Sequence, residues 1–125
     1  MAIESYELEF EFIGLDSCFG SLERIKAPLT IERISRKIPF KASGRFYIGG
    51  RDYFMIPLGI KKGLEHPTDT VEKGDIFYEA NSDSLFICLK AGSVGMAVTK
   101  LGKIVENLEV LNKISKYSPV NIKLR

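Results

Sequence analysis

The chain has 125 residues, of which 45% are apolar, and its 18 basic and 16 acidic side chains leave a net charge of +2 at pH 7. This length predicts one domain, residues 1–125, with a single core. The charges are mixed along the chain and form no basic stripe, which argues against nucleic acid as a partner. No apolar run approaches the roughly 20 residues of a membrane-spanning helix. The N-terminus lacks the layout of a signal peptide, so we expect a cytoplasmic protein without membrane contact.

The two cysteines each lie in an apparent strand, and we interpret Cys18 and Cys88 as small apolar core residues. With a single histidine and no CxxC motif, the chain offers no set of metal ligands, and we expect neither a metal nor a cofactor. Glutamine and tryptophan are absent, whereas isoleucine, lysine and glutamate are plentiful, a composition typical of thermophiles. If the source is a thermophile, a cytoplasmic disulfide is less unusual than in other organisms.

Residues 6–12 alternate strictly between apolar and acidic side chains, which predicts a half-buried strand. A turn at 14–16 returns the chain into a second strand over 18–25. The acidic row of Glu7, Glu9 and Glu11 raises the question of a metal site, but no second set of ligands faces it in the sequence. A solvated strand face is the favoured interpretation.

A helix is predicted over residues 28–38, because proline suits the first turn of a helix and a second proline ends this segment. Isoleucines recur on one face and charged side chains cover the other. We therefore expect a short amphipathic helix that covers one end of a sheet structure. Its basic residues Arg33, Arg36 and Lys37 fit a solvated face better than an anion site.

A glycine pair between two aromatic runs predicts a hairpin within residues 41–57. Strand alternation places Arg45 with Tyr47 on one face, and Arg51 with Tyr53 on one face. This mixture of aromatic and guanidinium side chains could bind an extended peptide or a small ligand, although aromatic residues at strand spacing are more often part of a core.

The middle of the chain combines a loop with the predicted centre of the fold. Residues 58–73 predict a long charged loop that could cover a pocket, and His66 within it has no assured catalytic partner. Residues 74–89 follow as two apolar, aromatic-rich strands around a cluster of small polar turn formers. Because both strands are apolar along most of their length, we expect them in the middle of a barrel or sandwich.

The last part of the chain predicts a strand over 96–99, a helix over 104–114 and a half-buried strand over 120–124. About eight strands and two helices result from the whole chain. The predicted fold class is therefore mainly β: a closed antiparallel β-barrel of about eight strands with two capping α-helices, because closure removes exposed strand edges.

Three segments of the chain resemble motifs of the cyclophilins, the prolyl isomerase barrels. They are APLTIE at 27–32, similar to A-P-x-T-V-E-N at the family's first helix; SLFIC at 84–88, similar to S/Q-F-F-I-C; and LGKIVEN at 101–107, similar to F-G-K-V-x-E-G. The closer resemblance is to a compact bacterial and archaeal group of cyclophilin-like proteins without an established function, in residues 37–40, 66–76 and 102–108. The resemblance covers most of the chain and implies the cyclophilin barrel.

The same resemblance implies little of the family's activity. Cyclophilins are understood to lower the isomerisation barrier of about 20 kcal/mol with an arginine, a glutamine and an apolar pocket. Phe86 matches a pocket position, and Arg45 or Arg51 could replace the arginine, although neither lies in the family's F-H-R context. The glutamine and the tryptophan are missing, and residues 96–100 lack the pocket histidine. Most of the isomerase machinery is therefore absent.

The leading hypothesis is a non-catalytic binding module that holds an extended peptide or a small ligand at Arg45, Tyr47, Tyr53 and Phe86. The enzymatic alternative is a weak or altered peptidyl-prolyl cis-trans isomerase, with Arg45 or Arg51 as candidate catalytic residues. A structural or interaction subunit is the third hypothesis, and the sequence leaves the oligomeric state open.

Overall fold

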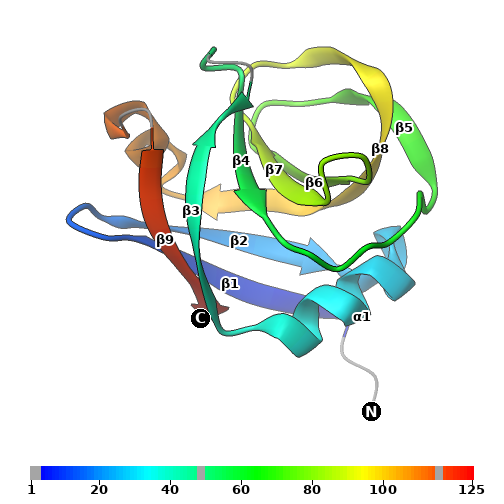
Figure 1. Ribbon diagram of the computed structural model, residues 1–125, viewed down its shortest axis with the longest axis horizontal. Helices are drawn as coiled ribbons and strands as arrows, with labels where there is room; N and C mark the ends of the chain where they lie inside the picture. Colours follow the sequence, from blue (N-terminus) through cyan, green and yellow to red (C-terminus); the bar gives the residue numbers. More distant parts are fainter. Residues whose placement is uncertain (1–3, 48–49, 115–116) are drawn as a thin grey trace.

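The computed structural model describes residues 4–47, 50–114 and 117–125, and its strands form one antiparallel sheet. The elements in chain order are β1 (Ser5–Phe12), β2 (Ser17–Glu23), the 3₁₀-helix η1 (Arg24–Lys26), α1 (Pro28–Lys37), β3 (Phe40–Phe46), β4 (Tyr53–Pro57), β5 (Pro67–Val71), β6 (Asp75–Glu79), β7 (Ser84–Cys88), β8 (Gly92–Glu106), the 3₁₀-helix η3 (Leu108–Lys113) and β9 (Tyr117–Leu124). Figure 1 shows the strands curved around a common interior, with α1 at one end.

Eight of these strands close into a barrel. Their order around it is β2, β1, β9, β3, β4, β7, β6 and β8, and β8 then pairs with β2. The remaining strand, β5, pairs with β8 outside this ring. The closed ring and the small helical content confirm the predicted fold class, and closure leaves no unpaired strand within the ring itself.

The longest strand, β8, belongs to two parts of the sheet. Its first part pairs with β5, where Thr68 lies opposite Val98, and its second part pairs with β6 and β2. The backbones of β8 and β2 approach so closely that a Cβ atom on Gly102 would lie 1.8 Å from the carbonyl oxygen of Ser21. Barrel closure therefore requires glycine at position 102.

The main hydrophobic core fills the barrel. In β1, Leu8, Phe10 and Phe12 are buried while the residues between them are not, the pattern of a strand with one solvated face. The strands β4, β6 and β7 differ, because almost every residue in them is buried. In β4, Phe54 packs in the barrel, whereas the neighbouring Met55 belongs to a second buried cluster on the outer side of the same strands.

The central hairpin is formed by β6 and β7, as the sequence predicts for residues 74–89. Its inward side chains join the main core, namely Ile76, Tyr78, Leu85 and Ile87. Its outward apolar side chains join the second cluster, namely Phe77, Phe86 and Cys88. Two apolar clusters on opposite faces explain why these strands do not alternate between apolar and polar residues.

The helix α1 begins at Pro28 and ends at Lys37, which confirms the predicted helix. Ile31 and Ile34 are fully buried in the main core, so the helix covers one end of the barrel through its apolar face. Among the described helices, none is long and apolar enough to cross a membrane.

The largest differences from the predictions lie in two segments. The sequence predicts a loop throughout 58–73, but residues 67–71 form β5, a strand of threonine and aspartate without apolar alternation. The sequence also predicts a helix over 104–114, but β8 continues through Glu106 and η3 begins only at Leu108, as a 3₁₀-helix. The pairing of Ile104 with Gly20 on β2 keeps this region extended, because that pairing closes the barrel.

Both cysteines are buried free thiols. Cys18 lies in the main core, where burial raises its pKa to about 12. Cys88 lies in the second cluster, and burial is the main cause that raises its pKa as well. Both thiols therefore stay protonated near neutral pH, which suits an apolar packing role and makes them poor nucleophiles.

Candidate functional site

The candidate site lies on the outer side of β3, β4, β7 and β6. Their register places Arg45 opposite Met55, Met55 opposite Phe86, and Phe86 opposite Phe77. Residues that lie opposite one another in neighbouring strands point to the same face of a sheet. The four side chains therefore form one row across the outside of the barrel, with the charged residue at its β3 end.

Four aromatic rings pack together along this row, and we call Tyr47, Tyr53, Phe77 and Phe86 the outer aromatic cluster. The ring of Phe86 is central: its centroid lies 5.1 Å from that of Tyr47, 6.4 Å from that of Tyr53 and 5.1 Å from that of Phe77. The rings of Tyr53 and Phe77 meet edge to face at 6.0 Å. Each such pair contributes roughly 0.5–1.5 kcal/mol beyond the burial of area.

Exposure divides the outer aromatic cluster into a floor and a rim. Phe77 and Phe86 have no exposed surface, whereas Tyr47 and Tyr53 are half-buried. The structure thus brings together Tyr47, Tyr53 and Phe86, which the sequence names as candidate binding residues. A ligand would contact the two tyrosine rings first, with Phe86 as the buried support beneath them.

The two candidate arginines have different surroundings. The side chain of Arg45 is exposed and forms no hydrogen bond or ion pair with any residue that the structure describes. Arg51 instead donates hydrogen bonds to the backbone carbonyls of Leu111, Asn112 and Ile114, at 3.2–3.4 Å, around the end of η3. Its guanidinium also lies 4.4 Å from the centroid of the Phe46 ring.

Alternation along the strand therefore does not place Arg51 with Tyr53. Arg51 lies two residues before β4 begins, outside the regular strand, so the period of two does not apply to it. Its donors hold η3 against the barrel, while Tyr53 packs on Phe77 and Phe86. Of the two arginines, only Arg45 is left with its donors unused by the described residues.

The first part of β8 and the neighbouring β5 cover one side of the outer aromatic cluster. Val71 and Val98 are buried against it, and Val94 and Met96 are partly buried there. Met96 also lines an open depression of about 590 Å³ between β5 and β8. The apolar surface of the cluster thus continues into a depression that is open to solvent.

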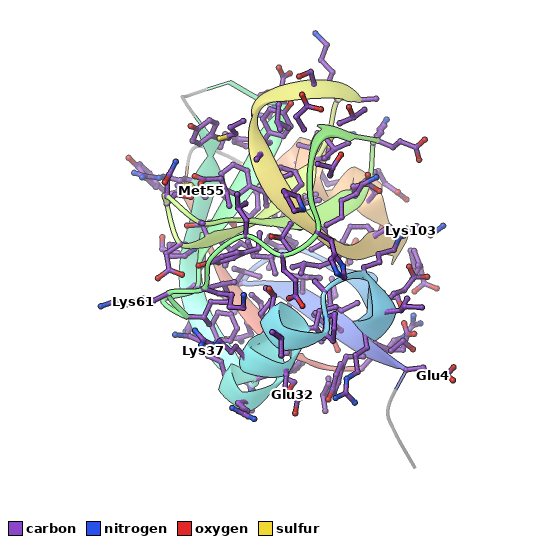
Figure 2. All side chains as sticks on the ribbon, turned by 90° about the vertical axis from the view of Figure 1, so that its right-hand side faces the viewer. Glu4, Glu32, Lys37, Met55, Lys61 and Lys103 are labelled. Atoms are coloured by element: carbon purple, nitrogen blue, oxygen red, sulfur yellow. The ribbon has the colours of Figure 1, made fainter. Side chains whose placement is uncertain are left out.

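A second cavity, which is polar and has a volume of about 250 Å³, lies at the start of β6, beside Asp75. Three lysines and three carboxylates line it, and Asp75 among them is buried. Asp75 accepts a hydrogen bond from the backbone N–H of Glu72 at 2.7 Å and pairs with Lys100 at 3.1 Å. Figure 2 shows Lys103, which lines this cavity, on the opposite side of the view from Met55. The balanced charges favour a structural ion-pair network over an anion site.

Two carboxylates that the sequence did not single out hold the loop of residues 58–66. Asp83 Oδ1 accepts hydrogen bonds from the backbone N–H groups of Ile60 and Lys61, each at 3.0 Å, and from the Tyr78 hydroxyl. Glu65 accepts hydrogen bonds from the first backbone N–H groups of α1 and from a threonine hydroxyl there. In the sequence, Asp83 is recognisable only as a turn-forming aspartate, and no sequence signal marks Glu65.

The remaining candidates from the sequence lie away from the outer aromatic cluster. In the acidic row, Glu7 and Glu9 accept hydrogen bonds from serines of β2, and Glu11 accepts one from Asn121 at 2.9 Å. The Asn121 amide and the charge of Lys123 hold the pKa of Glu11 below its usual value. His66 is exposed, and its Nδ1 lies 3.0 Å from the carbonyl oxygen of Lys26.

A family model described as Cyclophilin-like matches residues 7–123. The chain therefore belongs to the cyclophilin-like family. No curated protein matches the chain.

Solved structures that share the fold include the following two. The solution structure of the hypothetical protein AF2241 from Archaeoglobus fulgidus has a TM-score of 0.78 and 20% sequence identity, and the match covers 98% of this chain and 96% of that one. The structure of McbB in complex with tryptophan has a TM-score of 0.77 and 11% identity, and the match covers 93% of this chain but 44% of McbB. The chain thus spans less than half of McbB and nearly all of AF2241.

Proposed function

We propose that this cyclophilin-like barrel is a binding module whose outer aromatic cluster holds an extended peptide or a small ligand without chemical conversion. One observation carries the proposal: two half-buried tyrosine rings lie over fully buried phenylalanines on the outside of a barrel that already has its own complete core. Partly exposed aromatic rings on a rigid base are well suited to binding apolar ligands.

The neighbouring depression supports a ligand of more than a few atoms. It adjoins the cluster at Met96 and has a volume of about 590 Å³. Ligand sites in proteins commonly have volumes of about 300–1,000 Å³. The structure of McbB with tryptophan also gives one protein that contains this fold and is bound to an aromatic small molecule.

The side-chain chemistry favours binding over catalysis. Nη2 of Arg51 donates to backbone carbonyls around η3, and the chain has no glutamine to assist an isomerisation. Cys88, beside the cluster, is buried and its thiol donates to the carbonyl oxygen of Lys90 at 3.1 Å. Burial raises the pKa of Cys88 and of Tyr53, so neither is an ionised nucleophile or base near neutral pH.

The proposal is tested by a heteronuclear NMR titration with short Xaa-Pro peptides and with indole. We expect amide shifts in β4 and β7, and we expect Tyr53→Ala to weaken binding. Tyr6→Ala is the matched control, because Tyr6 is also a half-buried tyrosine but packs against the main core. If no probe shifts the amides of β4 and β7, the proposal is wrong. Accelerated cis/trans exchange of the peptides would instead support the isomerase alternative.

A further inference from the structure

At the β3 end of the outer row, no ion pair within the described part of the chain compensates the charge of Arg45. Arg45 is exposed and lies between Tyr117 on β9 and Met55 on β4, by the register of the three strands. No carboxylate forms an ion pair with it among the described residues, whereas five other cations have such a pair, namely Arg24, Lys26, Lys100, Lys123 and Arg125. Arg45 is therefore available to a ligand.

Two carboxylates near this face are held by other groups, and none of the described carboxylates forms an ion pair with Arg45. Asp75 pairs with Lys100, and Glu79 is buried and accepts hydrogen bonds from the backbone N–H groups of its own turn. Asp52 lies just before β4; burial is the main cause of the raised pKa of Tyr53, and the charge of Asp52 adds to it. Arg45 thus lies in the row that carries the aromatic surface, and no carboxylate among the described residues pairs with it.

Resting on the proposed function, we infer that the ligand of the outer aromatic cluster carries a carboxylate close to an aromatic ring. The ring packs on Tyr47 and Tyr53, and the carboxylate accepts hydrogen bonds from the guanidinium of Arg45. A planar guanidinium binds a carboxylate through two parallel hydrogen bonds, which gives preference for an acid over its neutral amide or an amine. A free aromatic acid and the C-terminus of a peptide that ends in phenylalanine both supply this chemistry.

The test compares ligands that share a ring and differ in charge. Indole-3-acetate, indole-3-acetamide and tryptamine are titrated separately into the full chain, and the Kd of each is obtained from amide shifts in β4 and β7. We expect the acid to bind about tenfold more tightly than the amide, and the amine to bind most weakly. Acetyl-Gly-Phe as the acid and as the amide distinguishes the peptide source from the free acid.

Arg45→Met removes the charge and keeps an unbranched side chain, and we expect it to abolish the preference for the acid. Lys41→Met is the matched control. Lys41 is also an exposed cation of β3, but in the strand register it lies opposite Asn121 of β9, away from the row. Equal Kd values for acid, amide and amine, or an unchanged preference in Arg45→Met, would overturn the inference and leave the proposed function intact. Failure of every ring compound and peptide to bind would overturn both.

Discussion

At the scale of single residues, Asp83 determines how the loop after β4 lies on the barrel. Its carboxylate and its backbone carbonyl together accept hydrogen bonds from four successive backbone N–H groups, those of residues 58–61. Its carboxylate also accepts from the hydroxyl of Tyr78, a fully buried residue. Burial and this hydrogen bond raise the pKa of Tyr78 to about 12, so the hydroxyl remains a donor.

We predict that Asp83→Ala lowers the free energy of unfolding by about 2–4 kcal/mol, because two loop N–H groups and the Tyr78 hydroxyl lose their acceptor. Urea denaturation followed by circular dichroism measures this change. Asp16→Ala is the control: Asp16 is an exposed turn residue, and its loss is expected to change stability by no more than about 0.5 kcal/mol. Equal stabilities of the two variants would contradict the prediction.

Glu65 caps α1 from a distant loop, since the residue before the helix, Ala27, has no capping side chain. Burial raises the pKa of Glu65, but the backbone N–H groups of Thr30 and Leu29 outweigh it and lower the pKa below the ordinary 4.5. Because the pKa of Glu65 is lower in the folded state, the ionised Glu65 carboxylate stabilises the fold fully above pH 4.5. This stabilisation is lost as the pH falls through the folded-state pKa.

We predict that Glu65→Gln lowers the free energy of unfolding at pH 7 by about 1 kcal/mol, because the charge and one acceptor at the helix N-terminus are lost. The difference from the unmodified chain should shrink as the pH falls below 4.5. Thermal unfolding followed at several pH values checks this. Glu4→Gln, at an exposed glutamate, should show no such pH dependence; a constant difference for Glu65→Gln would refute the assigned role.

At the scale of elements, sequence patterns identified the strands that have a clear apolar signal. The alternation of residues 6–12, the helix after Pro28 and the apolar hairpin of residues 74–89 were all recognisable, because each buries a regular face. β5 was not, since its threonines and aspartate are mostly exposed and only its pairing with β8 makes it a strand. The apolar spacing after Lys103 fits a helix, but the pairing with β2 decides the conformation of residues 104–106.

The candidate site shows the same limit. Tyr47, Tyr53 and Phe86 could be selected as aromatic strand residues, but their mutual packing depends on the order of β3, β4 and β7, which no local pattern specifies. Arg45 and Arg51 were equivalent in the sequence. The position of η3 distinguishes them, because its terminal carbonyls lie within reach of Arg51 alone of the two.

The closure between β2 and β8 depends on one glycine. We predict that Gly102→Ala destabilises the chain by about 3 kcal/mol or more, because the new methyl group would collide with the backbone of Ser21 and not with a movable side chain. Denaturation with urea or heat measures the loss. Gly63→Ala is the control, since a Cβ atom there meets nothing within 4 Å, and we expect it to leave stability nearly unchanged. Similar effects of both substitutions would show that this contact does not limit closure.

At the scale of the whole molecule, the fold depends on pairings between distant parts of the chain. β9 lies between β1 and β3, and Val120 and Ile122 on it are buried in the main core. We predict that a chain ending at Ile114 does not fold, because β1 and β3 each lose one of their two partner strands and the barrel is opened. Amide shift dispersion in an NMR spectrum tests this. A chain ending at Lys123 keeps most of β9 and should remain folded; a folded chain without β9 would contradict the prediction.

The length of β8 has a thermodynamic consequence. Val98 on this strand packs in the second buried cluster and Leu101 packs in the main core, so one continuous backbone is shared by both hydrophobic clusters. Alternate residues of β4, β6 and β7 divide between the same two clusters. We therefore expect the second buried cluster not to melt while the barrel persists, so that the chain unfolds as one cooperative unit. A molecule bound outside the barrel stabilises the whole protein, and its affinity is reflected in the melting temperature of the entire chain.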